Sequence, residues 1–284
     1  MSRTDTPSVR RMREGDLGTV TELTAAAFQR ELGDELTERR WRERIAHPFT
    51  TDPDGAFVAE LDGRVIGVAE AIGRERLWVL SMFAVQPGIQ SAGAGRMLLD
   101  HAGGYGRESG AGLIVSSNDP RALRLYASAG FALQPTLRAD GEVDRRALPR
   151  AHPGIREDDR ANDLESLGPL ARAVRGAPYT GELRYALARG ARLLRLGDRG
   201  FAVVYEDGSL WLLVASDEEA ASALLWHALA IADGPARVRW ITGAQQWAID
   251  PLVRARLQLT AYGALCVRGT PGTLQPFVPS VPFA

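Results

Sequence analysis

One short segment of small residues, which we call the glycine loop, has the composition of a phosphate-binding site. It reads Gln90-Ser91-Ala92-Gly93-Ala94-Gly95-Arg96 and joins an apolar stretch to an amphipathic one. This pattern is typical of a strand leading into a helix, whose first backbone N–H groups lack acceptors and carry partial positive charge. Small residues let these groups surround a phosphate or pyrophosphate, and Arg96 adds a charge. The alternative is a tight turn that binds nothing.

Two familiar phosphate loops do not match this segment. A Walker loop ends in Gly-Lys-Ser/Thr, and all 34 basic residues of this chain are arginine. The dinucleotide fingerprint requires a third small residue where Leu98 stands, and it requires the loop to follow the first strand of a βαβ unit directly. This sequence meets neither condition. The sequence therefore predicts a phosphate site that is neither a P-loop nor a dinucleotide site.

Residues for other kinds of catalysis are scarce. The four histidines, His47, His101, His152 and His227, have neither metal-site spacing nor a cysteine or carboxylate cluster beside them. The single cysteine, Cys266, permits no internal disulfide, as is usual in intracellular proteins. The nucleophile pattern Gly-x-Ser-x-Gly does not occur. We therefore expect no metal site and no hydrolase chemistry.

Length and charge narrow the class of protein further. A chain of 284 residues favours two domains. A net charge of −1 disfavours a nucleic-acid partner. No apolar run approaches the ~20 residues that span a bilayer, and the polar start lacks the apolar core of a signal peptide. We expect a cytoplasmic protein without a membrane segment.

The apolar patterns of the first half predict the order ααβββαβαβ. Asp62-Gly63 supplies the positive φ angles of a two-residue turn, so the segments beside it form a hairpin. The strand at 77–85 is apolar on both faces, as expected when helices cover both. The predicted helices are 17–28, 37–46, a helix from about 96 to 102, and 120–129; the predicted strands are 56–61, 64–72, 77–85, 112–116 and 131–137.

Residues 148–153 carry two prolines and little pattern, so we place a boundary there between domains 1–147 and 154–284. The second domain repeats the first in part, since Leu210-Trp211-Leu212-Leu213 matches Leu77-Trp78-Val79-Leu80. In place of the glycine loop it has Ser216-Asp217-Glu218-Glu219, which reads as a capping box with Glu219 reaching back to Ser216. Three carboxylates there would repel a pyrophosphate, so only the first domain is expected to bind one.

Two signatures taken together resemble the GNAT N-acetyltransferase superfamily. The first is Val85-x-Pro87 followed by Gln90-x-x-Gly93-x-Gly95, similar to the acyl-CoA pyrophosphate loop. The second is Asn118, then a helix with Leu125-Tyr126, then Gly130-Phe131. The resemblance covers residues 8–140. It implies an α/β fold of two tandem GNAT-like domains, each a central mixed sheet flanked by helices, with acetyl-CoA as donor and a degenerate second copy.

The resemblance also implies roles for single residues. Backbone groups of Phe83 and Val85 would pair with the pantetheine arm, the glycine loop would hold the pyrophosphate, and Asn118 would contact the coenzyme near its reactive end. Tyr126 stands where the superfamily often has a general acid for the leaving thiolate, and a phenol of pKa about 10 suits that task. Two alternatives stay open: Asn118 as a helix cap before Asp119-Pro120, and Tyr126 packed on the sheet.

The general base is sought among the carboxylates of the predicted strands. Glu70 lies in the strand at 64–72 among apolar neighbours, where a carboxylate is out of place unless it faces a polar cavity or a sheet edge. The alternative is an ordinary strand residue that faces solvent. Glu60 and Glu75 are weaker candidates for the base, and Ser81 is a candidate for contact with the acceptor.

The expected function is transfer of an acetyl group from acetyl-CoA to a primary amine of a small molecule, by direct attack in a ternary complex. Two other functions stay open: a non-catalytic acyl-CoA-binding regulatory module with a partner-binding second domain, and an α/β protein with an empty turn. Catalytic turnover distinguishes acetyl transfer from the non-catalytic acyl-CoA-binding module. The sequence names neither the acceptor nor the oligomeric state, with monomer and homodimer both open.

Overall fold

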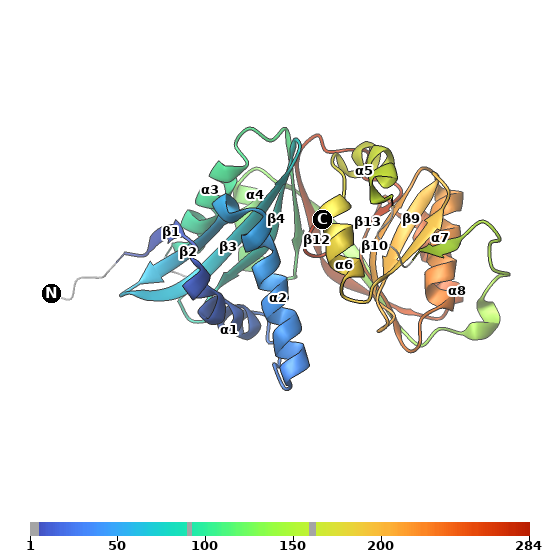
Figure 1. The fold of residues 1–284 in the computed structure, drawn as a ribbon, viewed down its shortest axis with the longest axis horizontal. Coiled ribbons are helices and arrows are strands. Elements are labelled where there is room, and N and C mark those ends of the chain that lie inside the picture. Colours follow the sequence, from blue (N-terminus) through green and yellow to red (C-terminus); the bar gives the residue numbers. More distant parts are fainter. Residues whose placement is uncertain (1–5, 90–92, 159–162) are drawn as a thin grey trace. The chain divides into compact units, whose positions relative to one another are not determined.

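The computed structural model describes residues 6–89, 93–158 and 163–284 (Figure 1). The chain divides into two compact units, Met1–Gly112 and Leu113–Ala284. Each unit combines β-sheet with packed helices. The α/β class predicted from the sequence is therefore confirmed.

The first unit has four antiparallel strands in the order β1-β2-β3-β4. Their bounds are Ser8–Arg11 (β1), Ala56–Leu61 (β2), Arg64–Arg74 (β3) and Leu77–Val85 (β4). The β2–β3 hairpin turns at Asp62 and Gly63, whose φ angles are 51° and 72°. These positive angles confirm the predicted two-residue turn.

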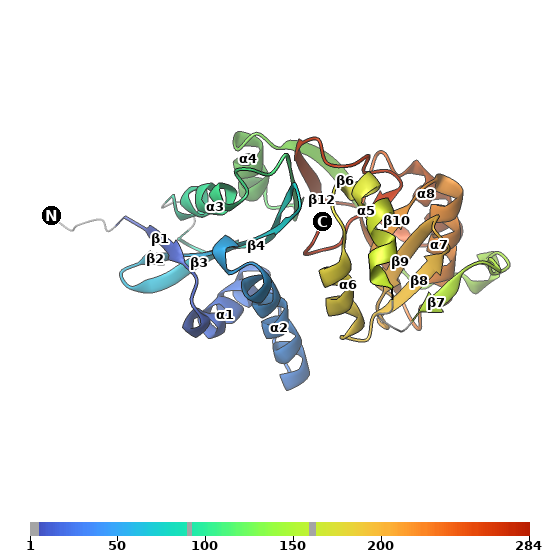
Figure 2. The same ribbon diagram turned by 45° about the horizontal axis from the view of Figure 1, so that its top comes forward.

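Helices cover both faces of this sheet, with α1 and α2 on one face and α3 on the other (Figure 2). The bounds are Leu17–Ala27 (α1), Glu35–Thr51 (α2) and Ala94–Tyr105 (α3), with short 3-10 helices at Glu14–Asp16 and Pro53–Gly55. Asp34 caps α2, since its carboxylate accepts a hydrogen bond from the backbone N–H of Thr37 across 2.8 Å. The helix predicted at 37–46 is therefore longer at both ends, and it continues past Pro48.

A hydrophobic cluster joins α1 and α2 to the sheet. It includes Val20, Ile45, Val68 and Met82, all buried. Side chains two positions apart on a strand share a face, so Glu70 on β3 points toward the same helices as Val68. The pleat of β3 thus places a carboxylate inside an apolar layer.

The second unit holds the remaining elements, with β5 beginning at the boundary. Its helices are Pro120–Ser128 (α4), Gly168–Arg175 (α5), Thr180–Leu187 (α6), Glu218–Ala230 (α7) and Gln246–Arg254 (α8), with 3-10 helices at Arg145–Ala147 and Leu164–Leu167. Its strands are Ala111–Ser116 (β5), Ala132–Gly141 (β6), Arg156–Asp158 (β7), Arg192–Leu196 (β8), Gly200–Val204 (β9), Leu210–Ala215 (β10), Ala236–Thr242 (β11), Gln258–Gly269 (β12) and Phe277–Val278 (β13).

Two groups of strands organise the second unit. One is the sheet β13-β10-β9-β8-β7, with α5 and α7 on opposite faces (Figure 2). In the other, β12 lies between β5 and β6, and β6 pairs on its far side with β11. Both neighbours of β6 are antiparallel to it and come from residues 236–269. The strand predicted at 131–137 extends to Gly141 because pairing with β12 continues to Asp140 and pairing with β11 to Gly141.

The pairing of β6 bears on the division predicted at residues 148–153. That division separates two halves whose sequence patterns partly repeat along the chain, and it stays a prediction. Strand pairing nevertheless crosses it, because β6 precedes residue 148 and both of its partners follow residue 153. The two halves therefore share hydrogen-bonded β-structure.

Candidate active site

The start of α3 has the conformation expected of the glycine loop. Gly93 is the N-cap residue, with a φ angle of 82° in the left-handed region that glycine favours. A Cβ atom added there would meet no atom of the described residues within 4 Å, so among them the backbone angle and not crowding favours glycine. α3 begins at Ala94, two residues before the predicted start near Arg96.

The rest of the glycine loop is described only in part. Gln90, Ser91 and Ala92 lie outside the described residues. Ala94 is buried and Gly95 is half-buried. Arg96 is exposed, and its Nε lies 3.9 Å from a carboxylate oxygen of Asp100, a solvent-screened pair of small energy. Pyrophosphate binding by this loop stays a prediction.

The predicted pantetheine contacts lie on β4. Phe83 and Val85 are half-buried and stand opposite Ala69 and Gly67 of β3. A Cβ atom on Gly67 would come within 2.9 Å of a methyl group of Leu98, so glycine lets α3 pack closely on the sheet. The sheet thereby supports the helix that follows the glycine loop, while pairing with pantetheine stays a prediction.

Glu70 is the most unusual carboxylate in the first unit. It is fully buried, and neither carboxylate oxygen has a hydrogen-bond partner among the described residues. Burial raises the pKa of Glu70 to about 8, although the charge of Arg44 acts in the opposite direction. The alternative of a solvent-facing strand residue is therefore wrong. A carboxyl group with a pKa near neutrality suits a general base.

A β-bulge lies beside Glu70. Between the partners of residues 70 and 71 of β3, the neighbouring strand β4 has one extra residue, Ser81. Arg44 on α2 donates a hydrogen bond from Nη2 to the backbone oxygen of Ser81 across 2.6 Å. The Ser81 hydroxyl is buried without a hydrogen-bond partner among the described residues. Glu70, Ser81 and Arg44 thus form a polar cluster beneath α2.

The other carboxylates considered as bases are placed differently. Glu60 accepts hydrogen bonds from Arg10 at 2.9 and 2.7 Å, in an ion pair at the β1–β2 edge. Glu75 lies between β3 and β4 with a φ angle of 52°, as a turn residue. Neither shares the apolar layer that perturbs Glu70, so Glu70 remains the first candidate.

In the second unit, Asn118 ties the end of β5 to β12. Its side-chain oxygen accepts a hydrogen bond from the backbone N–H of Gly263. The cap of α4 is instead Asp119, which accepts from the backbone N–H of Arg121 across 2.8 Å. The alternative of Asn118 as a helix cap is therefore wrong. Asn118 is exposed, and coenzyme contact stays a prediction.

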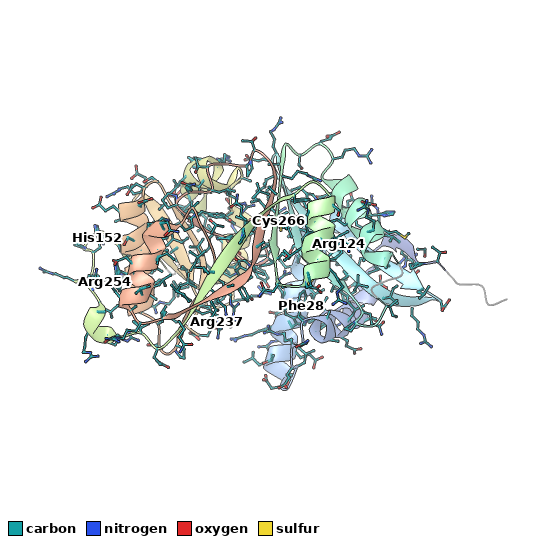
Figure 3. All side chains as sticks on the ribbon, turned by 180° about the vertical axis from the view of Figure 1, so that it is seen from behind. Phe28, Arg124, His152, Arg237, Arg254 and Cys266 are labelled. Carbon is teal, nitrogen blue, oxygen red and sulfur yellow. The ribbon has the colours of Figure 1, made fainter. Side chains whose placement is uncertain are left out.

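Tyr126 lies on α4 with its side chain buried. Burial, and next the nearby Cys266 of β12 and Asp119, raise the pKa of this phenol well above its usual range, so it keeps its proton. Figure 3 labels Cys266 on β12 and Arg124 on α4. The raised pKa makes this phenol a weaker acid than a free tyrosine, which disfavours transfer of its proton to a thiolate but still allows it to donate a hydrogen bond to one; the catalytic role of Tyr126 stays a prediction. The packing role is compatible with it.

In the second half, the segment that stands in place of the glycine loop leads into α7, and the cap of this helix differs from the prediction. Asp217, not Ser216, is the N-cap of α7, and its carboxylate accepts from the backbone N–H of Ala220 across 2.9 Å. Glu219 does not reach back but pairs with Arg199 at 3.0 Å. Asp is about as strongly favoured as Ser at an N-cap, and Asp217 is the residue with the extended backbone of that position. A carboxylate still occupies this helix start.

Residues 18–131 match the model of the Acetyltransferase (GNAT) family. Curated relatives named mycothiol acetyltransferase, from Streptomyces coelicolor and Streptomyces avermitilis, are 34% identical over 122 residues. These matches cover 40% of this chain and 38% and 39% of the relatives. The chain thus spans about two fifths of the length of the relatives it matches.

Solved structures share the fold over nearly the whole chain. A putative acetyltransferase from Pyrococcus horikoshii has a TM-score of 0.79 at 15% identity and covers 100% of this chain and 98% of its own. A tandem GNAT protein from the clavulanic acid biosynthesis pathway has a TM-score of 0.53 at 13% identity, covering 93% and 98%. Similarity at these identities shows the fold alone. It confirms the predicted tandem GNAT-like arrangement.

No helix in the described part of the chain combines the length and apolar character needed to cross a membrane. No group of three or more His, Cys, Asp or Glu side chains in this part of the chain is placed to hold a metal ion. Cys266 is buried, and burial raises the pKa of its thiol to about 12.

Proposed function

We propose that the protein transfers an acetyl group from acetyl-CoA to a primary amine of a small molecule, with Glu70 as the general base. One observation carries this proposal: a fully buried carboxyl group with a raised pKa lies beside a bulge in the strand that precedes the glycine loop. The match of residues 18–131 to the GNAT family model supports acetyl transfer, and the name of the curated relatives supports a small-molecule acceptor.

In the proposed reaction the amine nitrogen attacks the thioester carbonyl. A new C–N bond forms, the C–S bond breaks, and the electron pair leaves with the coenzyme sulfur. The amine gives up a proton to Glu70, directly or through a water molecule. Tyr126 donates a hydrogen bond to the leaving thiolate, which takes its proton from solvent. Backbone N–H groups at the start of α3, with Arg96, would hold the pyrophosphate.

Release of free thiol from acetyl-CoA across a panel of primary amines tests this function. Wild-type protein should release thiol with at least one amine, and Glu70→Gln should lower kcat/KM by about 10²- to 10⁴-fold. Tyr126→Phe should lower kcat while coenzyme affinity stays near that of the wild type. Thermal stabilisation by acetyl-CoA without thiol release from any amine would instead favour a non-catalytic coenzyme-binding module.

A further inference from the structure

Two β-bulges flank the same part of β6 in the second unit. On β11, Val238 and Ile241 pair with residues 139 and 137, so one extra residue lies between them. On β12, Ala261 and Ala264 pair with residues 137 and 135, so a second extra residue lies between those. Bulges redirect side chains and are common beside binding sites.

Each bulge contains a residue with a positive φ angle, which is strained at Trp240 but not at a glycine. Trp240 on β11 has a φ angle of 56°, and Gly263 on β12 has a φ angle of 63°. A bulky residue rarely adopts a left-handed backbone, and such outliers cluster at ligand sites. The strained conformation brings the rings of Trp240 and Tyr262 to 5.1 Å between centroids.

Arginine side chains gather around these rings. The guanidinium carbon of Arg239 lies 5.9 Å from the Trp240 ring centre and 6.0 Å from that of Tyr262. Arg138 on β6 lies 5.2 Å from the Tyr262 ring centre. Rings of this kind hold a guanidinium in place without neutralising its charge.

The charges in this cluster do not balance. Asp140 pairs with Arg138 at 3.1 Å and with Arg237, labelled in Figure 3, at 3.2 Å. Arg237 also lies 3.7 Å from Asp207. No described residue forms an ion pair or a hydrogen bond with Arg239, and its Nε is buried without an acceptor. Three arginines thus face two carboxylates, with one guanidinium left over.

The cluster adjoins the segment that carries Asn118. Trp240 donates a hydrogen bond from its indole nitrogen to the backbone oxygen of Ser116 across 3.4 Å. Gly263 donates its backbone N–H to the side-chain oxygen of Asn118. The two bulges are therefore each attached to the end of β5, beside the residue expected to contact the coenzyme near its reactive end.

We propose that Arg239, framed by Trp240 and Tyr262, binds a carboxylate group carried by the acceptor amine. The assignment of this carboxylate to the acceptor rests on the proposed function. A planar guanidinium binds a carboxylate through two parallel hydrogen bonds, and buried donors such as its Nε gain most from such a partner. One surplus positive charge matches one carboxylate better than a phosphate monoester of charge near −2.

Binding of N-acetylglycine and N-acetylglycinamide, measured by calorimetry without coenzyme, tests the site. The two molecules resemble the acyl product and differ in the carboxylate. Wild-type protein should bind the carboxylate roughly ten- to a hundredfold more tightly, and Arg239→Gln should abolish that preference. Arg239→Lys, which keeps the charge but loses the planar fork, should retain only part of it. Equal binding by the wild type, or no binding of either molecule, would overturn the proposal.

Arg254→Gln is the matched control, because Arg254 also lies over a tryptophan, 5.4 Å from the Trp226 ring centre, but is paired with Asp250. It should keep the preference for the carboxylate. Thiol release with amino acids and their amides then separates the two proposals. A carboxylate preference that depends on Arg239, without turnover of any amine, would refute the proposed function alone. Turnover with equal kcat/KM for acids and amides would refute the acceptor subsite alone.

Discussion

Arg44 on α2 donates a hydrogen bond from Nη2 to the backbone oxygen of Ser81, the extra residue of the β4 bulge, across 2.6 Å. The same guanidinium lowers the pKa of the buried Glu70, against the larger upward effect of burial. One side chain therefore both binds the bulge and supplies the positive charge that acts on the pKa of the candidate base. Arg44 acts through its neighbours and is a positioning residue.

Replacing Arg44 should change the pH dependence of catalysis. In Arg44→Gln the opposing charge is lost, so the pKa of Glu70 should rise above about 8, and the rising limb of kcat/KM should move to higher pH. Arg44→Lys should move it less. The measurement is a pH profile of thiol release with one amine. An unchanged limb in Arg44→Gln would show that the charge of Arg44 does not act on the base.

Glu70 should reduce stability at alkaline pH while it supports catalysis. Its pKa is about 8 when folded and 4.5 as an isolated group, so the folded state binds more protons between these values and the free energy of unfolding falls as pH rises through this window. Glu70→Gln should therefore stabilise the fold at pH 9, by an amount on the order of a few kcal/mol, and change it little at pH 4.

Thermal unfolding of both proteins across this pH range checks the prediction, with thiol release measured on the same samples. Glu70→Gln should be more stable than the wild type at pH 9 and nearly inactive. If Glu70→Gln were less stable than the wild type at pH 9, the carboxylate would have an acceptor role in packing that the structure does not show.

Local patterns allowed much of the first unit to be predicted. The turn at Asp62-Gly63 and the strand at Leu77–Val85 were located correctly, because each depends on residues close together in the sequence. β1 was not predicted, since its four residues carry little apolar pattern and become a strand by pairing with β2. The neighbours of β6 could not be predicted, because they depend on contacts more than ninety residues apart.

In the candidate site, too, the features that depend on neighbouring residues could be predicted and those that depend on distant contacts could not. Glu70 was recognised because a carboxylate interrupts an apolar strand, which is a local signal. Arg44 was missed because it is one of 34 basic residues and nothing in the sequence of α2 distinguishes it. Likewise, the Asn118–Gly263 hydrogen bond joins residues 145 positions apart, so it could not be predicted from the sequence.

Gly93 and Gly88 allow backbone strain to be separated from coenzyme contact. Both have positive φ angles, 82° and 89°, and at either position an added Cβ atom meets nothing within 4 Å in the part of the chain that the structure describes. Gly93→Ala and Gly88→Ala should each lose about 1 kcal/mol of stability. Only Gly93→Ala should weaken acetyl-CoA binding, about tenfold or more, when affinity is measured by calorimetry. Equal weakening in both variants would assign the effect to strain.

Asn118 has a structural role that can be separated from a role in coenzyme binding. Asn118→Ala removes the acceptor of the Gly263 N–H and should cost about 1 kcal/mol of stability, besides lowering coenzyme affinity. Asn118→Asp keeps the oxygen but loses the amide donor, so it should keep the melting temperature and still bind acetyl-CoA more weakly. Normal coenzyme affinity in Asn118→Asp would limit the residue to tying β5 to β12.

The position of β6 predicts that the first half cannot fold completely alone. In a fragment of residues 1–147, β6 would lose both β12 and β11, leaving two unpaired strand edges. This fragment should aggregate or unfold without cooperativity. The matched control is the full chain carrying a protease site at 150–152, in the exposed segment between the halves. After cleavage its two pieces should elute together in gel filtration, because pairing of β6 with β11 and β12 holds them. A folded, monomeric 1–147 fragment would show that the half is independent of its strand partners.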